Sequence, residues 1–159
     1  NKLLMHQQRI IMNKFLLGML TLVMFVSNAE ACIDDNLEDT RNFNNCQKVA
    51  EQGDPISQYQ LGLMYQMGKG VSQDYQQTFH WWSRAAEQGN AAAQHRLGYM
   101  YIQGYGVAQD YVMSHLWFNL ASLNGDQSAV VNRDVVAARM SKTQIKKALS
   151  LAKKWINRH

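Results

Sequence analysis

The sequence of 159 residues is poor in proline, with one, and in cysteine, with two. A single proline argues against a proline-rich linker, and one proline with ten glycines argues against a β-sandwich of many turns. Two cysteines without paired histidines cannot complete a tetrahedral metal shell, so we expect no metal site and no cofactor. A hydrophobic content of 47% is typical of a folded globular chain, and the length suits one domain.

The first 31 residues have the pattern of a secretory signal peptide. After Lys14 an apolar run fills residues 15–26, and a small-x-small end follows at Ala29 and Ala31. The run is shorter than the roughly 20 residues of a membrane-spanning helix. We expect residues 1–31 to be upstream residues plus a cleavable leader, and the protein to be periplasmic or secreted. A buried N-terminal core helix is the alternative.

Cleavage after Ala31 would make Cys32 the first mature residue. A lipoprotein anchor is one alternative, although Ala29-Glu30-Ala31 lacks the leucine that such signals carry. Disulfides persist outside the cytoplasm, so a bridge between Cys32 and Cys46 would pin the mature N-terminus to the first helix. An unbridged pair remains the other possibility.

The main feature of the chain is an internal repeat with a period of 36 residues. Residues 55–90 and 91–126 are identical at 14 of 36 aligned positions, among them Gly62/Gly98 and Trp81/Trp117. We expect one repeat domain at residues 32–159, made of a half repeat at 37–54, these two repeats and a degenerate capping repeat at 127–159.

Each repeat predicts two helices. Positions 58, 61, 62 and 65 share one helical face, and so do positions 78, 81, 82 and 85. Glycines such as Gly68 and Gly104 end the first helix, and Asp74 and Asp110 offer caps for the second. One helix pair cannot bury its own apolar face, so neighbouring pairs must stack. The sequence therefore predicts an all-α fold, a short α-solenoid of six or seven helices.

The motif Leu-Gly-x-Met-Tyr-x-x-Gly-x-Gly-Val-x-Gln-Asp-Tyr, followed by Trp, Ala and Gly, resembles the Sel-one-like repeat, a relative of the tetratricopeptide repeat. The resemblance covers about residues 46–126 and continues loosely to Trp155. It implies a right-handed, tetratricopeptide-like α-solenoid of the exported bacterial type, which mediates protein–protein interactions. Cysteine-rich relatives have been linked to penicillin binding and β-lactam hydrolysis. Residues 55–159 contain no cysteine, so that activity is not carried over.

The search for catalytic motifs finds one weak match. Ser150-Leu151-Ala152-Lys153 fits the Ser-x-x-Lys element of serine β-lactamases, but no Ser-Asp-Asn or Lys-Thr-Gly accompanies it. The histidines lack the His-Glu-x-x-His spacing, and no phosphate-binding loop follows a strand pattern. We therefore predict a scaffold without enzymatic activity. An envelope enzyme acting on β-lactams or peptidoglycan is the alternative.

The binding surface is predicted from positions that differ between the two repeats. Scaffold positions must repeat because the stacking repeats, whereas a surface that faces a ligand is free to vary. The first helices of such solenoids usually line the concave face, where we expect a peptide or protein partner. The six predicted contact residues are Tyr59, Leu63, Gln66, His95, Tyr99 and Ile102. Ordinary variable surface is the alternative.

The last predicted helix is strongly basic. From Arg133 to Arg158 there are eight basic residues and one acidic residue, Asp134. We expect Ile145, Leu149, Ala152 and Ile156 to form its packed stripe and the lysines to be solvated. Contact with an anionic partner or a membrane surface is the alternative, and nucleic acid is not expected.

Overall fold

The structure is a computed structural model that describes residues 39–159. The predicted signal peptide and Cys32 lie outside these residues. The described part contains seven helices and no strand, which confirms the predicted all-α fold. The helices are α2 (Asp39–Glu51), α3 (Pro55–Met67), α4 (Tyr75–Glu87), α5 (Ala91–Gln103), α6 (Tyr111–Leu123), α7 (Gln127–Ala137) and α8 (Lys142–Ile156).

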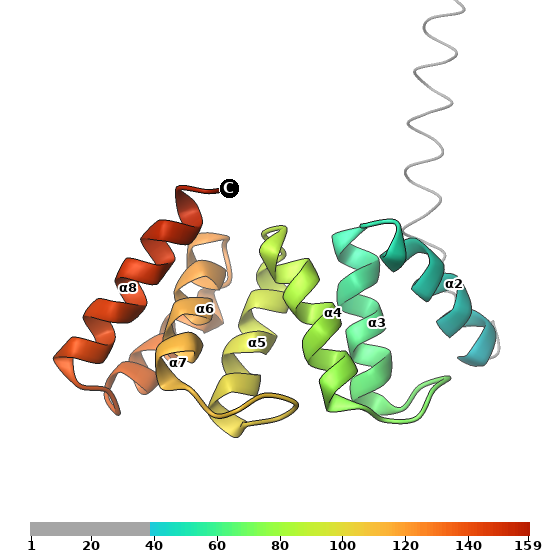
Figure 1. Ribbon diagram of the computed structural model, residues 1–159, viewed down its shortest axis with the longest axis horizontal. Coiled ribbons are helices and arrows are strands. Elements are labelled where there is room, and N and C mark those ends of the chain that lie inside the picture. Colours follow the sequence, from blue (N-terminus) through green and yellow to red (C-terminus); the bar gives the residue numbers. More distant parts are fainter. Residues whose placement is uncertain (1–38) are drawn as a thin grey trace, which may run out of the picture.

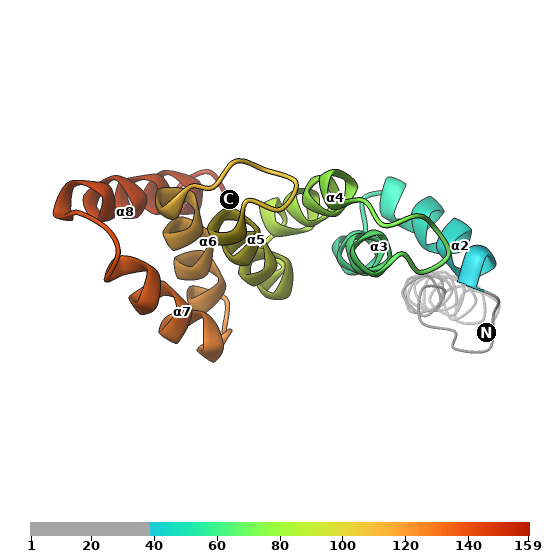
Figure 2. The same cartoon turned by 90° about the horizontal axis from the view of Figure 1, so that it is seen from below.

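Successive helices from α2 to α7 pack side by side into a short solenoid, and α8 lies at the end of the row opposite α2 (Figure 1). Viewed along the helices, α4 and α8 lie along one side of the row, and α3 and α7 lie along the other (Figure 2). The pairs α3–α4 and α5–α6 form the two central repeats, and α5 packs against α4 to join them. The molecule therefore presents two different helical surfaces.

The helix boundaries are set by local caps, and Gly68 and Asp74 have the capping roles that the sequence predicts. At the junctions between repeats, the side chains of Asp54, Asn90 and Asp126 accept hydrogen bonds from backbone N–H groups of the following helix. Gly68 ends α3 in the left-handed region, with φ 71°, a conformation that costs glycine little. These contacts depend on neighbours in sequence, so the pattern alone predicts them well.

A helical glycine brings the two helices of each repeat into close contact. A Cβ atom added at Gly98 would lie 2.6 Å from Cε1 of Phe118, and one added at Gly62 would lie 2.4 Å from Cδ1 of Trp82. The second helix thus inserts an aromatic ring over each glycine. Both rings are almost completely buried.

Buried glutamines connect one repeat with the next. Nε2 of Gln94 donates to the carbonyl of Ala86 at 3.0 Å, and its Oε1 accepts from Nδ2 of Asn124 at 2.9 Å. Gln58 makes the same pair of contacts one repeat earlier, with Ala50 and Gln88. Both glutamines are fully buried, so these bonds fix the position of each helix pair relative to its neighbours.

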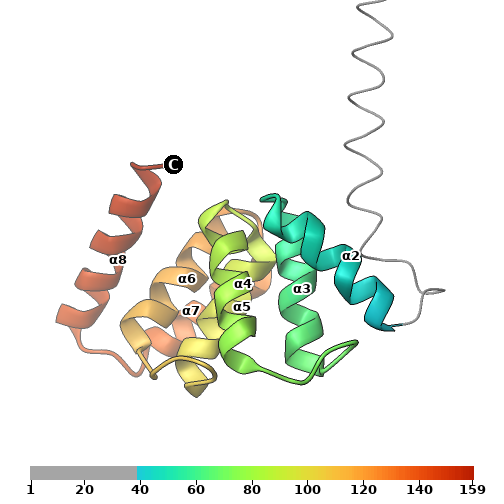
Figure 3. The ribbon, with the colours of Figure 1, turned by 45° about the vertical axis from the view of Figure 1, so that its right-hand side comes forward.

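The C-terminal helix does not continue the pairing of the repeats. α8 packs mainly against α6 and makes less contact with α7, and it is the outermost helix at its end of the row (Figures 1 and 3). Its packed face includes Ala148, Ala152 and Trp155. The stripe predicted from sequence is wrong in part, because Leu149 and Ile156 are each 48% exposed. The packed face of α8 is rotated relative to the predicted stripe, because α8 docks on α6 and buries the large Trp155 ring.

Candidate protein-binding site

The six predicted contact residues lie on α3 and α5, and three of them meet at one cavity. Tyr59 of α3 and His95 and Tyr99 of α5 line a hollow of about 240 Å³. Ala92, Arg96 and Asp126 complete its lining. The structure therefore places residues that are 36 to 40 positions apart in sequence around the same small cavity. We call this hollow the α3–α5 cavity.

The other three predicted residues lie beside this cavity rather than in it. Leu63 is half-buried and packs on the central core, and Ile102 is half-buried against the cluster that contains Phe118. The backbone carbonyl of Gln66 accepts a hydrogen bond from the Gln73 side chain at 2.7 Å. Leu63 and Ile102 thus contribute mainly to packing.

His95 is fixed in place by the beginning of α7. Its Nδ1 lies 2.5 Å from Oδ2 of Asp126, and its Nε2 lies 2.7 Å from the side-chain nitrogen of Asn132. A carboxylate only accepts, so these partners assign the proton to Nδ1, which donates to Asp126. Nε2 then accepts from the Asn132 amide. The imidazole is therefore held in a fixed orientation, and its face stacks on Tyr99 at a centroid distance of 5.6 Å.

Asp126 both caps α7 and orients His95. Its Oδ1 accepts from the backbone N–H groups of Ser128 at 2.9 Å and Ala129 at 3.2 Å. Burial alone would raise the pKa of this carboxyl. The hydrogen bonds from the Ser128 hydroxyl, His95 and the Ala129 amide outweigh that effect and lower the pKa below its ordinary value of 3.8. Asp126 is therefore ionised at neutral pH, and both of its carboxylate oxygens are engaged in hydrogen bonds.

Arg96 adds a positive charge over an aromatic surface. Its guanidinium carbon lies 5.9 Å from the centroid of the Trp82 ring, which itself stacks on Tyr59. The side chain is exposed and takes part in none of the ion pairs found between residues 39 and 159. The α3–α5 cavity therefore combines aromatic walls with a cation that is available to an incoming group.

Sequence comparison missed Arg96 and the second role of Asp126. Arg96 aligns with Gln60 and is as variable between the repeats as the residues that were selected. It lies at i+4 from Ala92, on the face that includes His95 and Tyr99, so a helical projection of α5 could have included it. The contact of Asp126 with His95 joins different helices and leaves no local signal.

Other kinds of site find little support in the described residues. No group of three side chains there is arranged to hold a metal ion. None of the helices from α2 to α8 is both long and apolar enough to cross a bilayer. Ser150 and Lys153 are both exposed on α8.

Cys46 is fully buried in the core beside α3, where its Sγ lies 3.6 Å from the carbonyl oxygen of Ser57. Cys32 is not among the described residues, so the bridge between them stays a prediction.

Comparison with known proteins identifies the repeat. The family model described as Sel1 repeat matches residues 55–90 and 91–126. The chain contains two Sel1 repeats. Proteins built from such repeats generally mediate protein–protein interactions and are typically scaffolds without enzymatic activity.

Two solved structures support the assignment. The chain is similar to a protective antigen with an SLR fold that is present in uropathogenic Escherichia coli strains, with 33% identity and a TM-score of 0.77 over 83% of this chain. It is also similar to a Sel1 repeat protein from Oxalobacter formigenes, with 31% identity and a TM-score of 0.60 over 60% of this chain. The chain covers 30% and 40% of those two proteins. A search of curated proteins gave no match.

Proposed function

We propose that this protein is an exported interaction scaffold that binds a peptide or protein segment at the α3–α5 cavity. The observation that carries the proposal is the convergence of Tyr59, His95 and Tyr99 around one hollow with Arg96, which forms no ion pair with a described residue. Tyrosine and arginine are enriched among the residues that dominate protein interfaces, because they offer large contact areas and directed hydrogen bonds.

The charge pattern favours a particular kind of segment. Arg96 is exposed, whereas the nearby carboxylate of Asp126 is engaged by His95 and Ser128. A partner that inserts an aromatic or aliphatic side chain between Tyr59 and Tyr99 would place a neighbouring acidic group near Arg96. We therefore expect an extended segment that combines an apolar residue with a carboxylate.

The experiment is site-specific photo-cross-linking of the full-length protein in the cell that produces it. A photoreactive phenylalanine analogue replaces Tyr99 in one sample and His80, which is exposed on α4, in the other. We expect a defined cross-linked partner from position 99 and none from position 80. Equal cross-linking from both positions, or none from position 99, contradicts the proposal.

Binding to the partner so identified is then compared between two matched triple variants. The first removes the site with Tyr59→Ala, Arg96→Ala and Tyr99→Ala. The control removes three exposed side chains of α4 with Gln76→Ala, Gln77→Ala and His80→Ala. We expect at least about a tenfold loss of affinity in the first variant, since each anchoring side chain of an interface contributes about 1 kcal/mol or more. Similar affinities for both variants would contradict this assignment of the surface.

Export is a separate part of the proposal and rests on the pattern of residues 12–31. Expression from Met12 followed by fractionation and N-terminal sequencing tests it. The expected product is found outside the cytoplasm and begins at Cys32. A full-length product retained in the cytoplasm contradicts export.

A further inference from the structure

A second and larger cavity lies on the other side of the solenoid, between α4, α6 and α8. Its volume is about 520 Å³, within the range of about 300 to 1,000 Å³ that small-molecule sites occupy. Its lining consists of Glu87, Met113, Leu116, Trp117, Leu151, Lys154, Trp155, Asn157 and Arg158. We call it the α6–α8 cavity. It shares no residue with the α3–α5 cavity.

The walls of the α6–α8 cavity are apolar. α6 contributes Leu116 and Trp117 from the central core, and α8 contributes Leu151 and Trp155. All four belong to or pack against the same hydrophobic cluster, so the walls are held in place by the core. The cavity results from the placement of α8, which docks on α6 and leaves a hollow beside the end of α4.

One side of the α6–α8 cavity is closed by a polar cluster around Glu87. The indole Nε1 of Trp155 donates to Oε2 of Glu87 at 2.9 Å, and Nε2 of His159 lies 3.5 Å from the same oxygen. The imidazole of His159 also stacks on the Trp155 ring, with centroids 4.2 Å apart. The single acidic group in the lining is therefore already engaged by two partners.

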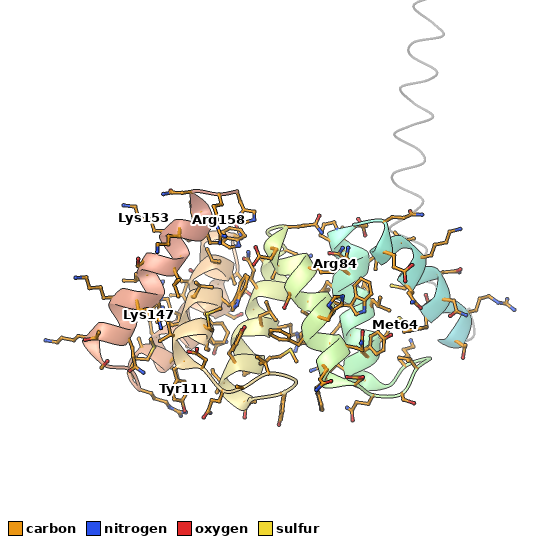
Figure 4. All side chains as sticks on the ribbon, in the orientation of Figure 1. Met64, Arg84, Tyr111, Lys147, Lys153 and Arg158 are labelled. Atoms are coloured by element: carbon orange, nitrogen blue, oxygen red, sulfur yellow. The ribbon has the colours of Figure 1, made fainter. Side chains whose placement is uncertain are left out.

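The lining of the α6–α8 cavity also carries two positive charges. Lys154 and Arg158 are exposed, and neither takes part in an ion pair with a described residue (Arg158 is labelled in Figure 4). Residues 135–159 contain no acidic side chain at all. The one carboxylate in the lining, Glu87, is engaged by Trp155 and His159, so neither cation forms an ion pair with a described residue.

We propose that the α6–α8 cavity binds a small amphipathic anion, an aliphatic or aromatic group that carries a carboxylate. The apolar part packs against Trp117 and Leu151, because burial of apolar area drives binding in such a hollow. The carboxylate is placed at the rim, where Lys154 and Arg158 donate charge-assisted hydrogen bonds. This site goes beyond the proposed protein-binding function, since it lies on the opposite helical surface.

Decanoate is a suitable probe, and 1-decanol is the uncharged control with the same chain. Titration calorimetry measures binding to the full chain, and tryptophan fluorescence reports on the site because Trp117 and Trp155 line it. We expect saturable decanoate binding and a fluorescence change. Binding of 1-decanol should be at least about tenfold weaker, as expected when a charged hydrogen bond of about 1.5 to 3 kcal/mol is missing.

Three variants locate the ligand. The double variant Lys154→Gln/Arg158→Gln should weaken decanoate binding at least about tenfold, for the same reason. Leu151→Trp fills the hollow and should abolish binding. Lys147→Gln removes an exposed lysine of α8 that does not line the cavity, so binding should change less than about twofold. Circular dichroism establishes that each variant is folded.

The proposal is overturned by any of three results. Absence of saturable decanoate binding to the folded wild-type protein shows that the cavity is not a site for such anions. Equal weakening by Lys147→Gln shows attraction to the basic helix as a whole, as expected for an anionic surface. Equal affinity for decanoate and 1-decanol, unchanged in the double variant, shows an apolar hollow without anion recognition.

Discussion

Replacement of Gly98 by alanine tests the contact that sets the spacing within a repeat. The new Cβ would meet three carbons of the Phe118 ring at 2.6, 2.7 and 2.8 Å. The ring would have to retreat by about 0.8 Å to restore ordinary contact, in a core that is packed as densely as a crystal. Phe118 is fully buried against Ala121, Ala129 and Val136, so the space behind it is occupied.

Two opposing terms decide the expected size of the effect. Overpacking of a well-packed core costs about 1 to 3 kcal/mol, and three clashing ring atoms place this substitution near the upper end. Replacing a helical glycine by alanine returns about 1 kcal/mol through helix propensity. We therefore expect Gly98→Ala to lower the free energy of unfolding by about 1 to 2 kcal/mol.

Urea denaturation followed by circular dichroism measures this change, and a double variant isolates its cause. In Gly98→Ala/Phe118→Leu the added methyl group occupies space that the smaller side chain leaves. The double variant should therefore be less destabilised than the two single changes added together, by about 1 kcal/mol or more. The reasoning is refuted if Gly98→Ala is as stable as the wild type, or if the two single effects simply add.

Three further substitutions test polar side chains that are buried or half-buried. Gln94→Met should lower the free energy of unfolding by about 1 to 3 kcal/mol, since it removes two buried hydrogen bonds, the one that Gln94 donates to the Ala86 carbonyl and the one that it accepts from Asn124; a urea midpoint equal to the wild type would contradict this. Asp126→Asn should destabilise the protein at pH 7 and progressively less as the pH falls below 3.8, because the folded protein depresses the pKa of the carboxyl and its contribution is lost as the pH falls through the folded value; a destabilisation that stays the same down to acid pH argues against it. Burial, and secondarily the nearby Arg133, lowers the pKa of His115 below its ordinary 6.5, so the stability of the protein should fall as the pH drops from 7 to 5. In His115→Leu the melting temperature should depend less on pH over this range. An unchanged pH dependence of the melting temperature would be inconsistent with a buried neutral histidine.

The two cavities give the molecule two distinct surfaces. The α3–α5 cavity is bordered by tyrosines and an arginine, as protein interfaces often are. The α6–α8 cavity has apolar walls and two cations, Lys154 and Arg158, in its lining. Both cavities border the central core. The helices α5 and α6, which pack against each other, separate an anion in the α6–α8 cavity from the α3–α5 cavity. Measuring partner affinity with and without decanoate would show whether the two sites are coupled.

The candidate binding site could be predicted in part. Tyr59, His95 and Tyr99 were selected because they differ between repeats, and the structure brings all three to one cavity. Leu63 and Ile102 satisfied the same criterion but are half-buried in the core. A difference between the repeats therefore indicates that a position is not part of the contact that repeats along the solenoid. It does not show whether the side chain is exposed or packs elsewhere in the core.

The sequence by itself determined the helices, their ends and the period of the solenoid. These features depend on contacts within a few residues, such as the cap of Asp110 on α6, and on an apolar pattern that repeats every 36 positions. Only the tertiary structure decided that Phe118 covers Gly98, that α8 docks on α6 and that a cavity opens between them. Those outcomes depend on how the shapes of side chains from different helices fit together, a property that local patterns do not contain.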